Sequence, residues 1–253
     1  MVRSRAVRLG WSSCGAGAVA ESRRAELEGR LSAVQHQIAS AAQDSGRSYD
    51  DVVLVVVTKT WPTSDVRILH DLGVRDIAEN RHQDAEHKAH ELADLDLWWH
   101  FIGQIQSNKA ARIATYADVV HSVDSVRVAA RLAAAAQQHQ RLIDCFVQVN
   151  LDPEMARGGR GGVTGDDLDA VARAVEESDG LRLRGVMGVA PLHGDADTSY
   201  RMLARTSRHL RTAHPGATGV SAGMSGDFPA AIRAGATHVR VGSAVLGQRP
   251  VLR

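Results

Sequence analysis

The chain shows two kinds of hydrophobic pattern. Near its start, aliphatic residues recur at spacings of four and three, which predicts one buried face of a helix over about residues 21–42; these residues are Leu27, Leu31, Val34 and Ile38. The run VVLVVVT at residues 52–58 is apolar without alternation, which is typical of a parallel strand covered on both faces. Beyond it, strand-like and helix-like patterns alternate to residue 243.

Eight strand-like segments follow the first helix. The predicted strands are 52–58, 74–80, 98–103, 118–123, 141–151, 181–190, 217–223 and 237–243. Helical patterns separate them at 64–73, 81–92, 107–116, 125–139, 165–178, 198–213 and 227–235. This order predicts an α/β fold with a single (β/α)8 barrel and an extra N-terminal helix. The alternative is an open doubly wound sheet, although no GxGxxG follows the first strand.

We expect one barrel domain over residues 21–253. The first 20 residues mix basic, glycine and serine positions, so we interpret 1–20 as a disordered extension and not as a secretory signal. After the fifth strand, residues 152–165 contain five glycines and predict a mobile loop.

Composition excludes several function classes. The 30 basic and 29 acidic residues nearly cancel, and no basic face accumulates, so we expect no nucleic-acid partner. No apolar run reaches the length of a membrane span. The two cysteines, Cys14 and Cys145, lie far apart, which favours a reducing, cytoplasmic setting. We expect a monomer.

Lysine is rare in this chain, and Lys59 directly follows the most apolar strand. Only three of the 30 basic residues are lysines, Lys59, Lys88 and Lys109, so arginine supplies most positive charge. Unlike arginine, a lysine that is partly removed from water can lose its proton and attack a carbonyl. The alternative is a lysine at a strand end whose ammonium reaches water.

Two glycine- and serine-containing turns follow the seventh and eighth strands. They are SAGMSGD at 221–227 and VRVGSAV at 239–245. Glycine lets the backbone approach a ligand closely, and barrels often bind phosphate at these two loops. Ordinary turn chemistry uses the same residue types, so each loop alone is weak evidence. Because a barrel closes its eighth strand onto its first, Lys59 and both loops would face one mouth. Pyridoxal 5′-phosphate (PLP), which carries a phosphate and an aldehyde, would suit both features.

Several segments match a known family. They are VTKTWP (57–62), AENRHQD (78–84), WHFIGQIQSNK (99–109), RGVMGVAP (184–191) and 221–247. With them, the chain resembles the pyridoxal phosphate homeostasis proteins, whose barrel is similar to the N-terminal domain of alanine racemase. The resemblance runs from about residue 21 to 249 and implies a PLP-binding protein of vitamin B6 homeostasis.

The resemblance also implies roles for individual residues. Lys59 would hold PLP as a Schiff base, and Arg240 would lie near the pyridine nitrogen. Asn80 would lie beside the cofactor ring. The phosphate would be held by Met224, Ser225, Gly242 and Ser243. The chain departs from the family at Ala78, Arg81, Asp84 and Ala222 and in the loop with Arg157 and Arg160, which puts contacts at Arg81 and in that loop in doubt.

The sequence favours a PLP carrier or buffer, with no catalytic residue assigned. In alanine racemase a second domain supplies a tyrosine opposite the lysine. The three tyrosines here, Tyr49, Tyr116 and Tyr200, are predicted away from the carboxyl ends of the strands. A cation beside the ring nitrogen would also disfavour its protonation and weaken the ring as an electron sink. We therefore expect PLP, and apo PLP-dependent enzymes, as partners. A racemase-like PLP enzyme is the alternative.

The histidines suggest no metal site to us. His82, His87 and His90 fall on one predicted helix without the geometry of a ligand set, and a solvated helix face explains them. For His100, a place beside the cofactor ring and a structural, hydrogen-bonded role both stay open.

Overall fold

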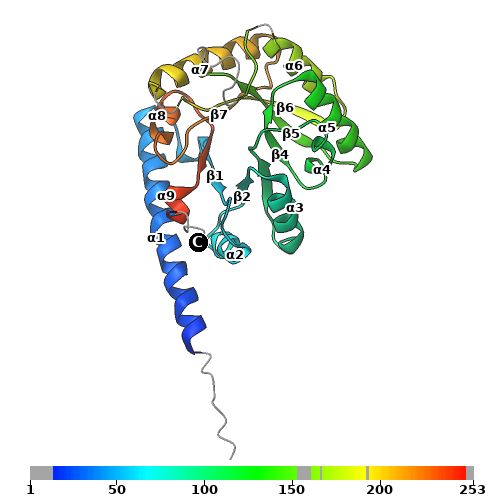
Figure 1. The fold of residues 1–253 in the computed structure, drawn as a ribbon. Helices are drawn as coiled ribbons and strands as arrows, with labels where there is room; N and C mark the ends of the chain where they lie inside the picture. The colour runs from blue at the N-terminus through cyan, green and yellow to red at the C-terminus, as the bar shows by residue number, and fades with distance from the viewer. Residues whose placement is uncertain (1–13, 153–160, 166, 192–193, 249–253) are drawn as a thin grey trace, which may run out of the picture.

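The strand prediction is confirmed by a closed barrel. The computed structural model describes residues 14–152, 161–165, 167–191 and 194–248. In this part of the chain, eight parallel strands pair in sequence order and β8 closes onto β1 (Figure 1). Their bounds are β1 Val53–Val57, β2 Asp76–Glu79, β3 Trp98–Phe101, β4 Val119–Val123, β5 Ile143–Val149, β6 Leu181–Gly188, β7 Gly219–Ser221 and β8 His238–Val241. The open-sheet alternative is therefore wrong.

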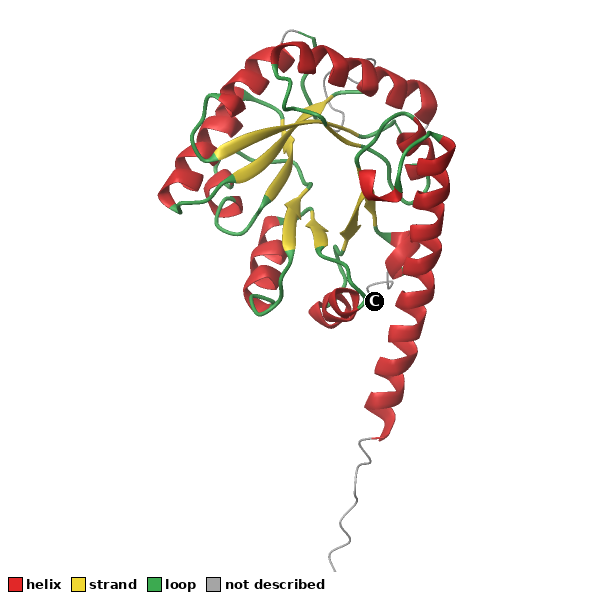
Figure 2. Ribbon diagram, turned by 180° about the vertical axis from the view of Figure 1, so that it is seen from behind, coloured by secondary structure: helices red, strands yellow, loops and turns green. Residues whose placement is uncertain are grey.

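Helices surround the barrel (Figure 2). They are α1 Cys14–Asp44, α2 Thr63–Asp71, α3 His82–Glu91, α4 Ala110–Ile113, α5 Val126–Gln138, α6 Asp167–Glu176, α7 Ala196–Ala213, α8 Phe228–Arg233 and α9 Ser243–Leu246, with a short 3-10 helix, η1, at Tyr49–Asp51. No helix in the described ranges combines the length and apolar character that a membrane crossing needs.

The extra helix α1 packs along one side of the barrel against α8 and α9 (Figure 1). Its predicted apolar stripe is buried, with Leu27 and Ile38 fully inaccessible. The helix begins at Cys14, so helical backbone reaches into the segment 1–20 that we expected to be a disordered extension. Residues 1–13 lie outside the described residues, as do 153–160 of the predicted glycine-rich loop.

Two helix predictions need correction. The helix expected over 107–116 is only the single turn α4, and the Thr115 hydroxyl donates to the Arg112 carbonyl, which offers the chain an alternative to further helix. The other correction is α9, which the sequence did not predict. It spans four residues between Gly242 and Gly247 and is too short to show a helical period.

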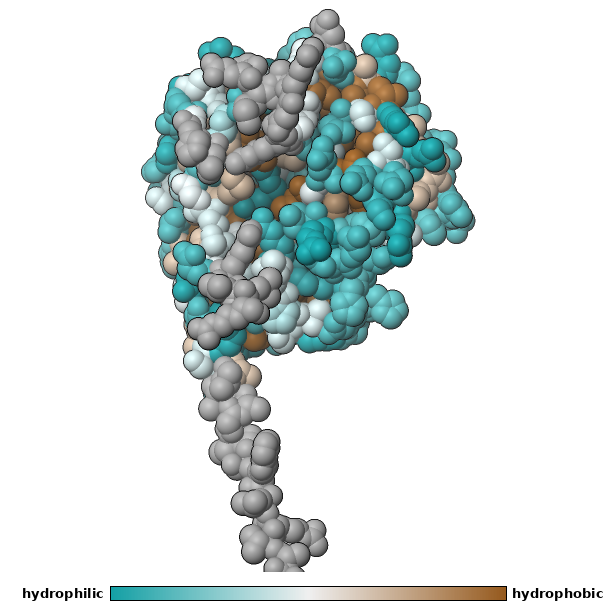
Figure 3. All heavy atoms as spheres, in the orientation of Figure 1, coloured by the Kyte–Doolittle hydropathy of each residue, from teal (hydrophilic) through white to brown (hydrophobic). Residues whose placement is uncertain are grey.

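Alternating burial explains the apolar first strand. Val55 and Val57 pack inside the barrel with Ala78, whereas Val56 belongs to the large cluster between the barrel and the helices. Both faces of β1 are therefore apolar. The face of the molecule in Figure 3 is largely hydrophilic, with hydrophobic residues showing mainly in its upper part.

Candidate functional site

A cavity of about 410 Å³ lies at the carboxyl ends of β1, β7 and β8. It brings together six of the seven residues singled out from the sequence, namely Lys59, Met224, Ser225, Arg240, Gly242 and Ser243. Trp61 and Ile102 add apolar wall. Asn80, the seventh, directly follows β2 and is exposed, and it is not one of the lining residues. The predicted ligand contacts of all seven residues stay predictions.

Lys59 occupies a tight turn after β1. The amide of Trp61 donates to the carbonyl of Thr58 at 3.0 Å, which closes a four-residue turn around Lys59. Thr60 in this turn has φ +71°, a left-handed conformation that costs a β-branched residue of order 1 kcal/mol or more. Such local strain persists only where neighbouring structure fixes the backbone, so the position of Lys59 is imposed by its surroundings.

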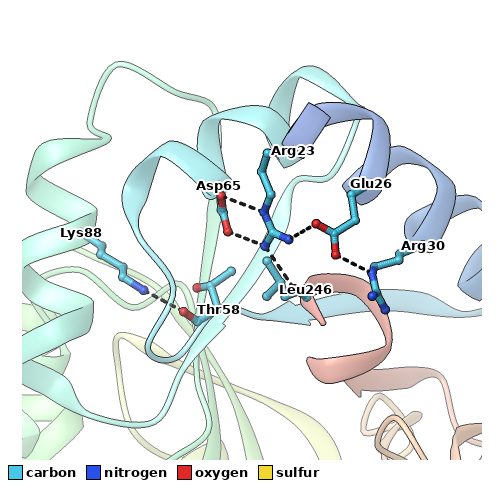
Figure 4. A network of polar contacts seen from close by, with 7 residues as sticks. All are labelled: Arg23, Glu26, Arg30, Thr58, Asp65, Lys88 and Leu246. Atoms are coloured by element: carbon cyan, nitrogen blue, oxygen red, sulfur yellow. Dashed lines mark hydrogen bonds and ion pairs between the residues drawn. The ribbon is translucent and has the colours of Figure 1, made fainter. Parts of the chain in front are cut away.

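A buried ion pair holds the residue that precedes Lys59 in this turn. The Lys88 ammonium of α3 donates to the Thr58 carbonyl at 2.8 Å (Figure 4). It also contacts Glu79 Oε1 at 2.5 Å. The Thr58 hydroxyl donates to the same carboxylate oxygen at 2.8 Å. Glu79 is fully buried, and its Oε2 has no hydrogen-bond partner among the described residues. Thr58, the residue just before Lys59, is thus held by α3 through its carbonyl and by β2 through its hydroxyl.

A second network joins the N-terminal helix to the rim of the cavity (Figure 4). Arg23 of α1 donates to Asp65 of α2 at 2.7 Å and to the Leu246 carbonyl at the end of α9 at 3.0 Å. Its guanidinium carbon also lies 4.7 Å from the centre of the Trp61 ring, within the range of a cation–π contact. One arginine therefore holds α1, α2, α9 and a cavity wall together. Its pKa is raised, mainly by the hydrogen bond to Asp65.

Ser225 reaches across from the loop after β7 to the start of α9. Its hydroxyl oxygen accepts hydrogen bonds from the backbone amides of Gly242 and Ala244, each at 3.2 Å. The loop itself is fixed by Asp227, which accepts from the Met224 amide at 2.6 Å and from the Tyr200 hydroxyl at 2.7 Å. Among the described residues that line the cavity, Ser225 and Ser243 supply hydroxyls beside the Gly242 backbone, and none is a carboxylate.

Glycine is required at one point of this loop. Gly223 has φ +89°, and a Cβ placed there would lie 2.7 Å from the Phe228 Cα. The carbonyl of Gly223 accepts from the Arg240 amide at 2.9 Å, which ties the ends of β7 and β8 together. The tight turn thus packs the loop against α8 and ties it to β8.

Arg240 points into the barrel from β8 and lines the bottom of the cavity. It is 4% exposed, and burial lowers its pKa to about 10, so the guanidinium stays charged at neutral pH. It donates to Ser221 Oγ at 2.6 Å and to the Gly188 carbonyl at 3.0 Å. No carboxylate pairs with this guanidinium directly among the described residues, which leaves a buried cation facing a ligand-sized space.

The other singled-out residues lie away from the cavity. His100 is buried and hydrogen bonded to Asp76 and His121, so its structural alternative holds. His82 is buried while His87 and His90 are exposed, and the described residues contain no group of three potential metal ligands. Lys109 caps α4 and is not a lining residue.

Sequence reasoning missed Arg23, Asp65, Lys88, His121 and Asp227. Lysine scarcity, which singled out Lys59, was the available signal for Lys88. The other four make contacts with residues far away in sequence, such as Asp227 with Tyr200 at 27 residues and Arg23 with Leu246 at 223, which no local pattern reveals.

All three tyrosines are described, and none lines the cavity. Tyr49 precedes β1 in η1, at the opposite end of that strand. Tyr116 is buried outside the cavity, and burial raises its pKa. Tyr200 is buried on α7 and bonded to Asp227. The prediction that no tyrosine stands at a strand's carboxyl end agrees with these positions.

Comparison with known proteins places the chain in a family. The family model of the alanine racemase N-terminal domain matches residues 30–250. The pyridoxal phosphate homeostasis protein of Mycobacterium tuberculosis is 39% identical over 243 residues, covering 90% of this chain and 94% of that protein. Its counterpart from Pseudomonas aeruginosa is 40% identical over 219 residues, covering 87% and 94%.

Solved structures agree. PipY of Synechococcus elongatus, solved with PLP bound, is 32% identical with a TM-score of 0.76, covering 87% of this chain and all of that one. Alanine racemase from Corynebacterium glutamicum, at 16% identity and a TM-score of 0.62, shares the fold over 62% of its own chain. The chain therefore belongs to the family of the pyridoxal phosphate homeostasis proteins, whose fold is that of the alanine racemase N-terminal domain.

Proposed function

We propose that this protein holds PLP in the cavity and acts in PLP homeostasis as a carrier or buffer. The observation that carries the proposal is that a lysine amine, two serine hydroxyls beside the Gly242 backbone and a buried arginine line one cavity. PLP presents an aldehyde, a phosphate and a ring nitrogen, one for each of these features. The PLP-bound relative of Synechococcus elongatus supports the same assignment.

The donor set fits the group. The Ser225 and Ser243 hydroxyls offer uncharged donors for a phosphate beside the Gly242 backbone, whose amide donates to Ser225 Oγ, and no carboxylate among the described lining residues opposes an anion. Gly242 leaves little space there, since a Cβ would lie 3.2 Å from the Val57 carbonyl oxygen. Met224 covers the phosphate end, and Asn80, beyond the lining residues, is proposed beside the ring from the family resemblance alone.

Lys59 supplies the covalent attachment in this proposal. Its Nζ condenses with the aldehyde, forming a carbon–nitrogen double bond and releasing one water. Hydrolysis of this link returns the free aldehyde and the free amine, so the bound aldehyde is masked and can still be recovered. That property suits a buffer of a reactive cofactor.

Two features support a protein that holds PLP over an enzyme that turns over amino acids. No tyrosine lines the cavity to serve as a proton-transfer partner opposite Lys59. The charged Arg240 near the ring nitrogen would disfavour protonation there, because like charges repel, and an unprotonated ring is a poorer electron sink. In this proposal Lys59 binds PLP and Arg240 orients it, and no tyrosine among the described lining residues stands opposite Lys59 as in a racemase.

The proposal includes the setting of the protein. A monomer is the proposed working unit. Apo PLP-dependent enzymes of the cytoplasm are the proposed acceptors, and the buried free thiol of Cys145 suits a reducing compartment.

The test is transfer. PLP-loaded protein is mixed with an apo PLP-dependent enzyme, and recovery of that enzyme's activity is compared with recovery from free PLP and from PLP mixed with Lys59→Ala. The proposal predicts recovery from loaded wild type, at a rate set by release, with no racemisation of amino acids by the protein alone. Sustained racemase turnover by the purified protein, lost in Lys59→Ala, would favour the enzyme alternative.

A further inference from the structure

A continuous polar chain crosses the apolar interior of the barrel. Asp76 Oδ1, at the start of β2, lies 3.0 Å from His100 Nε2, and His100 Nδ1 lies 2.8 Å from His121 Nε2. His121 Nδ1 lies 2.8 Å from Ser221 Oγ, which accepts from Arg240 at 2.6 Å. The chain thus runs from the amino-terminal end of β2, through β3, β4 and β7, to the arginine that lines the cavity.

Hydrogen-bond accounting allows one direction along this chain. Arg240 can only donate, so Ser221 Oγ accepts from it and directs its own hydroxyl hydrogen to His121 Nδ1. A neutral His121 then carries its hydrogen on Nε2 and donates to His100 Nδ1. By the same logic His100 carries its hydrogen on Nε2 and donates to Asp76, which as a carboxylate can only accept. Every donor therefore meets an acceptor between a cation and an anion.

The surroundings keep the middle of the chain neutral. His121 is fully buried, and burial, with the charged Arg240 nearby, holds its pKa well below the ordinary value. Phe146 of β5 stacks on the His121 ring, with centroids 4.8 Å apart. Asp76 keeps 30% of its side chain exposed, so the anionic end of the chain meets solvent.

We propose that Asp76, His100, His121 and Ser221 are positioning residues that form a directional hydrogen-bond chain and fix the guanidinium of Arg240 at the floor of the cofactor site. The proposal rests on the proposed function for the identity of the ligand that Arg240 faces. None of the first three residues lines the cavity, so they act through Ser221.

The physical reason is the single hydrogen of Ser221. While His121 Nδ1 accepts it, the hydroxyl cannot rotate and the oxygen lone pairs stay directed at Arg240. If Asp76 no longer accepts from His100, both histidines are free to exchange tautomers. A His121 with its hydrogen on Nδ1 would donate to Ser221 and release the serine hydrogen toward Arg240, two donors in opposition.

The test compares two replacements of similar size at the far end of the chain. Asp76→Asn retains an acceptor oxygen, and Asp76→Leu removes it. The control is His214→Gln, which removes a buried histidine that pairs with Glu176 outside the barrel. Nitrogen NMR of protein labelled at histidine and arginine, without PLP, reports the tautomers of His100 and His121. The side-chain nitrogen signals of Arg240 report how firmly its guanidinium is held. PLP titration followed by absorbance reports the cofactor end.

The expected result is a neutral Nε2–H tautomer for both His100 and His121 in wild type and Asp76→Asn. In Asp76→Leu the tautomers mix, the Arg240 guanidinium rotates faster, and the PLP dissociation constant rises about twofold to tenfold, the value of one hydrogen bond. His214→Gln changes none of the three.

Two results would overturn the proposal. One is an Nδ1–H tautomer or a charged ring at His121 in wild type at neutral pH. The other is an Arg240 signal that stays unchanged in Asp76→Leu. If wild type gives no PLP absorbance change, the proposed function fails, and the NMR measurements on the protein alone still decide for or against the chain.

Discussion

The buried pair of Lys88 and Glu79 offers the sharpest test of how the Lys59 turn is held. The perturbation is Lys88→Met, which keeps a long, unbranched side chain in the same space and removes the charge. Glu79 is fully inaccessible, and its second oxygen already lacks a partner among the described residues. Without Lys88, only the Thr58 hydroxyl remains to stabilise the carboxylate.

The magnitude follows from this burial. Removing one partner of a buried ion pair costs about 3–5 kcal/mol, because the remaining charge is uncompensated. For a chain of this size each kcal/mol lowers Tm by about 2–4 °C, so we expect a loss of about 6–20 °C. Glu79→Gln in the same background removes the stranded charge, so the double variant loses less stability than the sum of the two single losses, by a coupling of about 0.5–3 kcal/mol.

The assay is urea unfolding and thermal melting of the two single variants and the double variant. Arg112→Met is the matched control, since it breaks the surface pair, 3.2 Å apart, between Arg112 of α4 and Glu86 of α3, the helix that carries Lys88. It should cost less than about 1 kcal/mol. A Lys88→Met protein as stable as Arg112→Met, or a double variant whose loss is the sum of the singles, would refute the reasoning.

Three further predictions concern the loops of the site and the barrel interior. Ser225→Ala removes the acceptor that bridges to the Gly242 amide and should raise the PLP dissociation constant about tenfold or more by titration, whereas Ser45→Ala, just after α1, should not. Gly223→Ala should destabilise the fold by more than about 1 kcal/mol in urea, because of its φ of +89°, while Gly226→Ala, with open space around it, should not. Burial lowers the pKa of His238 to about 3, so the unfolded chain binds the extra proton first, and stability is lost as pH falls from about 6.5 toward 3. His238→Gln should reduce the slope of stability against pH in that window by up to about 1.4 kcal/mol per pH unit, and an unchanged slope would contradict the assignment.

Local hydrophobic patterns in the sequence were enough to predict the barrel. Each strand was a short apolar run between helical patterns, and β1 to β8 all lie within the predicted segments. The cavity was predictable for the same reason. Lys59, Ser225 and Gly242 stand at strand ends, and a closed barrel brings the ends of β1, β7 and β8 together whatever the details of packing.

What failed to show in the sequence depends on distant contacts. Arg23 meets the end of α9 223 residues away, and His121 meets Ser221 100 residues away. The inward direction of His121 follows from strand alternation, but its partner follows only from how β4 and β7 face each other across the barrel. Helix α9 was missed because four residues between two glycines contain no period to read.

The central claim is that Lys59 binds PLP covalently, and borohydride reduction tests it most directly. The protein is incubated with PLP, reduced, digested and mapped by mass spectrometry. Because the chain has only three lysines, the assignment is unambiguous. The account predicts a pyridoxyl-phosphate adduct on the Lys59 peptide, absent in Lys59→Ala. An adduct confined to Lys88 or Lys109, or no adduct with PLP in excess, would contradict it.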